Sequence, residues 1–103
     1  MNSINAGLSA DVVAKLKEVF GRYSEIKKVV LYGSRAMQNY KLGSDIDLTI
    51  FSDSLSLTQL LKIETEIDDL LLPYKVDLSL YSQIDNPGLI DHINRVGVEF
   101  YKG

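Results

Sequence analysis

The chain has 103 residues, with 14 acidic and 11 basic side chains and a formal net charge of −3 at pH 7. This length predicts one domain with one core, residues 1–103, and leaves no room for a second substrate-binding domain. The acidic balance and scattered basic residues disfavour direct nucleic acid binding and template-directed synthesis. Absence of cysteine excludes disulfides and thiolate metal sites, and no apolar run is long enough to span a bilayer, so we expect a cytoplasmic protein without membrane attachment.

Helical and strand patterns follow one another along the chain, so we expect both kinds of element in one domain. Ser9 is a candidate N-cap for the first helix, Ser56 opens a capping box for the second, and Pro73 stops that helix. The second helix is expected to bury a leucine-rich stripe: Leu57, Leu60, Leu61, Ile67, Leu70 and Leu71. The patterns predict helices near residues 10–23, 57–72 and 87–96, and strands near 28–32, 45–51, 72–81 and 98–101.

A glycine–serine turn follows the first predicted strand. The apolar run 29–32 ends at Gly33, and the residues after Ser34 are good helix formers, so the two residues lie at an expected strand-to-helix junction. Backbone N–H groups at a helix start have no intrahelical partner. Such a turn is typical of a phosphate-binding site.

Two carboxylates, Asp45 and Asp47, begin the second predicted strand. Polar and apolar residues alternate here, so Asp45, Asp47 and Thr49 should share one face. Two anions this close repel each other unless a cation bridges them, and oxygen ligands suit Mg²⁺. The alternative is a turn residue, Asp45, followed by a solvated strand position. The Gly33–Ser34 turn a short loop upstream favours the metal site.

A third acid, Asp77, lies between Val76 and Leu78 in the third predicted strand. A carboxylate in so apolar a strand is costly to bury without a partner. If this strand lies beside the Asp45–Asp47 strand, the three carboxylates form a cluster suited to two cations and to nucleotidyl transfer. The alternative is an edge-strand acid that faces water.

These residues resemble the pattern of the DNA polymerase β-type nucleotidyltransferase superfamily. Within this superfamily, the chain resembles the minimal nucleotidyltransferase (MNT) group over about residues 29–101. The resemblance rests on the short chain and on the motif that runs from Gly-Ser-Arg-Ala to Gly-Ser-Asp-Ile-Asp-Leu. The resemblance implies an α+β nucleotidyltransferase fold, a single domain with a mixed β-sheet covered by helices. It also implies that Asp45 and Asp47 bind two Mg²⁺ ions, and that Asp77 completes the acceptor-side metal and helps to deprotonate the attacking hydroxyl.

The same resemblance implies a site for a nucleoside triphosphate, expected to be ATP. Gly33 and Ser34 would hold its phosphates, with Arg35 and Ser44 as further candidate contacts. For Arg35 the alternative is a solvent-facing helix residue. Many relatives carry Arg-Gly where this chain has Met37-Gln38, a departure in the phosphate loop that leaves the carboxylates intact. His92, the one histidine, is expected to have a surface or packing role and not a catalytic one.

The resemblance also implies which molecule accepts the nucleotide. MNT proteins of this kind are similar to antitoxins that pair with helical HEPN-domain ribonuclease toxins and attach AMP to a toxin tyrosine. One alternative is an enzyme that modifies a small molecule such as an aminoglycoside, with a separate helical subunit completing its pocket. Another is a catalytically idle module that binds a partner without transfer.

Overall fold

The computed structural model describes residues 6–41 and 43–103 of the chain. The three helices and four strands expected near residues 10–23, 28–32, 45–51, 57–72, 72–81, 87–96 and 98–101 are present. Their bounds are α1 (Ala10–Gly21), β1 (Lys28–Tyr32), β2 (Ile46–Phe51), α2 (Leu57–Asp68), β3 (Val76–Leu80), a 3₁₀ turn (Tyr81–Gln83), α3 (Pro87–Val96) and β4 (Val98–Lys102). None of the helices in the described ranges is long and apolar enough to cross a membrane.

The strands form one mixed sheet in the order β3-β2-β1-β4. β1 pairs antiparallel with both β2 and β4, whereas β2 and β3 run parallel. Parallel strands need a crossover connection, and α2 supplies it between β2 and β3. This arrangement confirms the predicted α+β fold with a mixed sheet.

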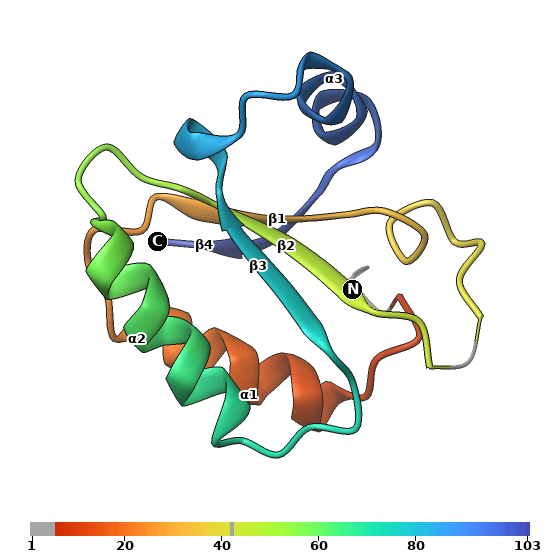
Figure 1. Cartoon of the computed structure of the whole chain (residues 1–103). Coiled ribbons are helices and arrows are strands. Elements are labelled where there is room, and N and C mark those ends of the chain that lie inside the picture. The colour runs from red at the N-terminus through yellow and green to blue at the C-terminus, as the bar shows by residue number, and fades with distance from the viewer. Residues whose placement is uncertain (1–5, 42) are drawn as a thin grey trace.

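One face of the sheet carries α1 and α2, which lie side by side beneath it in Figure 1. Ser9 caps α1 and the Ser56–Gln59 capping box is formed at α2. Alternate residues of β2, Ile46, Leu48 and Ile50, point toward these helices and are fully buried. The main apolar core therefore lies between the two helices and this face.

The apolar stripe of α2 differs from the predicted one. Ile63 and Ile67 are its buried residues, whereas Leu57, Leu61 and Leu71 are 56%, 62% and 87% exposed. Leu57 and Leu61 point away from the stripe that Ile63 and Ile67 define. Leu71 lies beyond the helix, which ends at Asp68, and its φ of 55° is left-handed backbone.

The opposite face of the sheet is covered by α3, drawn above the strands in Figure 1. A second apolar cluster of Val30, Tyr32 and Ile93 holds this helix against β1. The side chains of Asp45, Asp47 and Asp77 belong to this second face, because they alternate with the buried residues of β2 and β3. The acidic side chains of β2 and β3 thus lie on the side of the sheet away from the main core.

Candidate active site

Asp47 and Asp77 are paired across the sheet. They are register partners in the parallel β2–β3 ladder, and Asp45 lies two residues before Asp47, one residue ahead of β2. Asp47 is half-buried, whereas Asp45 and Asp77 are exposed. The predicted common face is therefore present, and the two strands are adjacent, as the three-carboxylate cluster requires.

The carboxyl group of Asp47 is surrounded by negative charge. Burial raises the pKa of its carboxyl, and the carboxylates of Asp77 and Asp45 raise that pKa further. A carboxylate whose neighbours oppose its ionisation gains when a cation arrives. The electrostatics of this face therefore favour a positively charged ligand.

The Gly33 turn lies directly against Asp47. Gly33 has a φ of 77°, and a Cβ added to it would stand 2.3 Å from Asp47 Oδ2. Tyr32, the preceding residue, is the register partner of Asp47 in the β1–β2 pair. Only glycine allows both this backbone conformation and this close approach. The expected phosphate turn and the expected metal ligand are thus in one place.

The helix expected after Gly33 is a single turn. The N–H of Met37 donates to the carbonyl of Gly33, but Gln38 has a φ of 66° and ends the helical backbone. Gln38 and Asn39 then donate to the carbonyls of Arg35 and Ser34, in a Schellman arrangement. The prediction of a short helix was wrong because this cap closes the helix after one turn.

The turn nevertheless leaves backbone donors unpaired. Within residues 6–41 and 43–103, the N–H groups of Ser34, Arg35 and Ala36 have no hydrogen-bond acceptor. Three successive free N–H groups at the start of a helical turn are suited to phosphate oxygens.

Arg35 has a structural position that the sequence did not predict. Its side chain is 2% exposed, and its guanidinium donates to the carbonyls of Ala6 (2.7 Å) and Ser44 (2.9 and 3.1 Å). The guanidinium carbon lies 5.0 Å from the ring centroid of Tyr40 and 4.8 Å from that of Tyr74. Both expectations for the Arg35 side chain, a phosphate contact and a solvent-facing position, are therefore wrong. Its guanidinium group is buried between two aromatic rings and already donates to two carbonyl oxygens.

We expect Arg35→Ala to lower the free energy of unfolding by about 3 kcal/mol, because it leaves two carbonyls without their charged donor. Urea unfolding measures this. The matched control is Arg95→Ala, which removes an exposed arginine paired with Asp91 at 2.8 Å and should cost about 0.5 kcal/mol or less. Equal losses in the two variants would contradict the structural role of Arg35.

Ser44 also supports the loop. Its hydroxyl oxygen accepts from the N–H of Lys41 at 2.8 Å, and its carbonyl receives the Arg35 guanidinium. These bonds act within the β1–β2 connection, so they do not support the predicted nucleotide contact of Ser44.

His92 is the residue whose place in the site the sequence missed. Its Nε2 accepts a hydrogen bond from the N–H of Gly33 at 3.2 Å, and its ring meets Tyr32 edge to face, with centroids 6.2 Å apart. Gly33 and His92 are 59 positions apart in the sequence. Only the packing of α3 on β1 brings them together.

The three acids are not closed into a preformed metal cluster. Among the described residues, no group of three histidine, cysteine or acidic side chains is close enough to hold a metal ion as it stands. The donor set still fits Mg²⁺, because it is anionic, consists of oxygen, and raises the pKa of its central member, Asp47.

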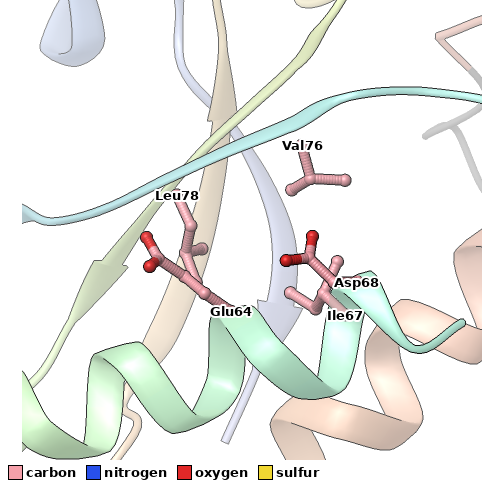
Figure 2. Close-up of a pocket in the computed structure, with 5 residues that line it drawn as sticks. All are labelled: Glu64, Ile67, Asp68, Val76 and Leu78. Carbon is pink, nitrogen blue, oxygen red and sulfur yellow. The ribbon is translucent and has the colours of Figure 1, made fainter.

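A separate cavity lies between α2 and β3. Figure 2 shows Glu64, Ile67 and Asp68 of the helix facing Val76 and Leu78 of the strand, around a volume of about 220 Å³. Val76 and Leu78 point to the side of the sheet opposite Asp77. This cavity is therefore not part of the carboxylate site.

The family model described as Polymerase beta, Nucleotidyltransferase matches residues 14–103. The chain belongs to this nucleotidyltransferase family, which confirms the predicted enzyme class. Among its relatives are two Methanocaldococcus jannaschii proteins, each named as a candidate protein adenylyltransferase. They are 33% and 32% identical to it over 78 residues, which are 75% of this chain and 79% of each relative.

Solved structures confirm the resemblance to the MNT group at the level of the fold. A toxin–antitoxin crystal structure with AMP-PNP superposes with a TM-score of 0.70 at 18% identity, covering 93% of this chain and 75% of the other. The complex of a tri-AMPylated Shewanella oneidensis HEPN toxin with its MNT antitoxin gives a TM-score of 0.65 at 15% identity, covering 89% and 71%.

Proposed function

We propose that this chain is a Mg²⁺-dependent adenylyltransferase that moves AMP from ATP to a tyrosine hydroxyl of a helical HEPN-type toxin and thereby acts as an antitoxin. The observation that carries the proposal is the register pairing of Asp47 with Asp77, directly beside the Gly33 turn. The pairing supports the assignment of the carboxylates as metal ligands, and the amides that have no acceptor among the described residues support a phosphate site beside them. The names of the adenylyltransferase relatives and of the toxin–antitoxin complexes support the choice of nucleotide and partner.

The reaction assigns a separate task to each part of the site. The N–H groups of Ser34, Arg35 and Ala36 bind the triphosphate. Asp45, Asp47 and Asp77 would hold two Mg²⁺ ions, which neutralise charge on the attacking and leaving oxygens. The acceptor oxygen attacks the α-phosphorus, the bond to the bridging oxygen breaks, and pyrophosphate leaves. Asp77 takes the hydroxyl proton, which an exposed carboxylate at the rim of the site can pass to water.

Asp77→Asn should separate chemistry from binding. We expect the single-turnover rate to fall by about a hundredfold or more, because the acceptor proton loses its base, while the Kd of Mg²⁺–ATP rises much less. Ser34→Ala is the matched comparison: it keeps the backbone N–H but removes the hydroxyl, a further candidate phosphate contact, so it should weaken nucleotide binding modestly with a smaller loss of rate. Calorimetric titration beside a rapid-quench assay decides. Equal damage to binding and chemistry in Asp77→Asn would make Asp77 a structural acid.

The partner is tested by co-expression of this chain with a candidate helical HEPN-domain toxin. The intact mass of that protein should increase by one or more AMP groups, located on tyrosine by peptide mapping. Purified alone, the chain should bind Mg²⁺–ATP but transfer little to small hydroxyl compounds, since they lack the contacts that hold an acceptor in place for attack. Efficient labelling of an aminoglycoside by the isolated chain would contradict the antitoxin function.

A further inference from the structure

His92 connects α3 to Gly33, the residue just before the three amides that have no acceptor among the described residues. Nε2 accepts from the Gly33 N–H, so this nitrogen carries the lone pair in the observed arrangement. The ring is half-buried and is held in place by its edge-to-face contact with Tyr32. The hydrogen bond is thus made by an oriented acceptor and not by a mobile surface side chain.

This hydrogen bond distinguishes two kinds of backbone N–H group in the turn. The Gly33 N–H is occupied by His92 and is not available to a phosphate, whereas those of Ser34, Arg35 and Ala36 have no acceptor in the described part of the chain. The Cα of Gly33 also stands against the Asp47 carboxylate. Holding the Gly33 amide therefore fixes both the direction of the following amides and their distance from Asp47.

We propose that His92 is a positioning residue of the nucleotide site: by accepting the Gly33 N–H, it holds the turn so that the next three amides face the triphosphate beside Asp47. This inference rests on the proposed function for the identity of the nucleotide. His92 touches the turn and not the reacting atoms. Its loss should therefore weaken nucleotide binding, which the ground state and the transition state share, more than it slows transfer.

The test compares two substitutions. His92→Gln keeps an acceptor oxygen at a similar reach, whereas His92→Leu fills space without an acceptor. We expect the Kd of Mg²⁺–ATP, measured by calorimetry, to rise about three- to tenfold in His92→Leu, the loss that one hydrogen bond predicts. His92→Gln should stay within about twofold of the unmodified chain, as should Arg95→Gln, which changes only an exposed ion pair of α3. Single-turnover rates with saturating ATP should change little.

A second measurement needs no nucleotide. Amide hydrogen exchange at Gly33, followed by NMR, should accelerate in His92→Leu and remain slow in His92→Gln. A chain of natural sequence that does not bind ATP would overturn the proposed function. If it does bind ATP, equal Kd values or unchanged Gly33 exchange in His92→Leu would overturn the positioning role alone. A collapse of the rate with unchanged Kd would also overturn it, since that result assigns His92 to catalysis.

Discussion

Asp47→Asn is expected to abolish most Mg²⁺-dependent transfer, by about a hundredfold or more, while making the metal-free chain more stable at neutral pH. The loss of activity follows because a neutral amide is a poor ligand for a hard cation, and metal stabilisation of the transition state is worth several kcal/mol. The gain in stability follows because asparagine has nearly the same shape as aspartate and removes the charge that Asp77 and Asp45 oppose. Rapid-quench transfer assays and thermal unfolding in a chelator measure the two effects.

The gain should depend on pH in a defined direction. The folded-state pKa of Asp47 is raised, first by burial and then by its acidic neighbours. The protonated form therefore favours the folded chain, and this contribution is lost as the pH rises through the raised pKa. Asp47→Asn should gain stability over the unmodified chain near pH 7 and lose that gain in acid, below the ordinary carboxyl pKa of about 3.9. Near-normal transfer by the folded variant, with Mg²⁺ as the only metal, would refute the ligand assignment.

Gly33→Ala is expected to destabilise the chain by about 1–3 kcal/mol and to reduce transfer strongly. An L-residue at a φ of 77° is strained, and the new methyl group would occupy the space of Asp47 Oδ2, 2.3 Å away. The Asp47 carboxylate is the end of a side chain and can rotate, so the clash is relieved by moving the expected metal ligand out of place. Urea unfolding and the transfer assay should both report the change.

Gly43→Ala is the matched control. Gly43 has a similar φ of 84°, but a Cβ there would meet no atom of the described residues within 4 Å. It therefore carries the cost of left-handed backbone, about 1–2 kcal/mol, without the contact to Asp47. We expect Gly43→Ala to lose stability while keeping most of its transfer activity. Similar activity losses in the two variants would show that loop strain, and not the approach to Asp47, limits the reaction.

The sequence predicted those parts of the site that depend on local pattern. Strict alternation around Asp47 predicts which face it occupies, and the apolar run before Gly33 predicts where the turn begins. The pairing of Asp47 with Asp77 required an assumption about strand order, which the family resemblance supplied and the β2–β3 ladder confirms. Register between distant strands is set by the packing of whole elements, so a single strand does not contain it.

Arg35 and His92 illustrate what local pattern does not contain. Arginine is rarely fully buried, so its position after a phosphate turn indicated either a ligand contact or a solvent-facing residue. Its actual partners, the carbonyls of Ala6 and Ser44, come from segments before and after it. His92 meets Gly33 only after α3 has folded over β1. In both cases the signal is a tertiary contact.

The central claim is that the carboxylate site transfers a nucleotide. The most direct test is to follow which phosphate of ATP is transferred to the partner. ATP labelled at the α-phosphate or at the γ-phosphate is incubated with Mg²⁺, the purified chain and its HEPN-type partner. Our account predicts that α-label appears on the partner, that γ-label does not, and that Asp47→Asn and a metal chelator each abolish the signal. Transfer of γ-label would identify phosphoryl transfer and contradict the account. A tight complex with no label from either position would contradict it equally, in favour of a module that binds without catalysis.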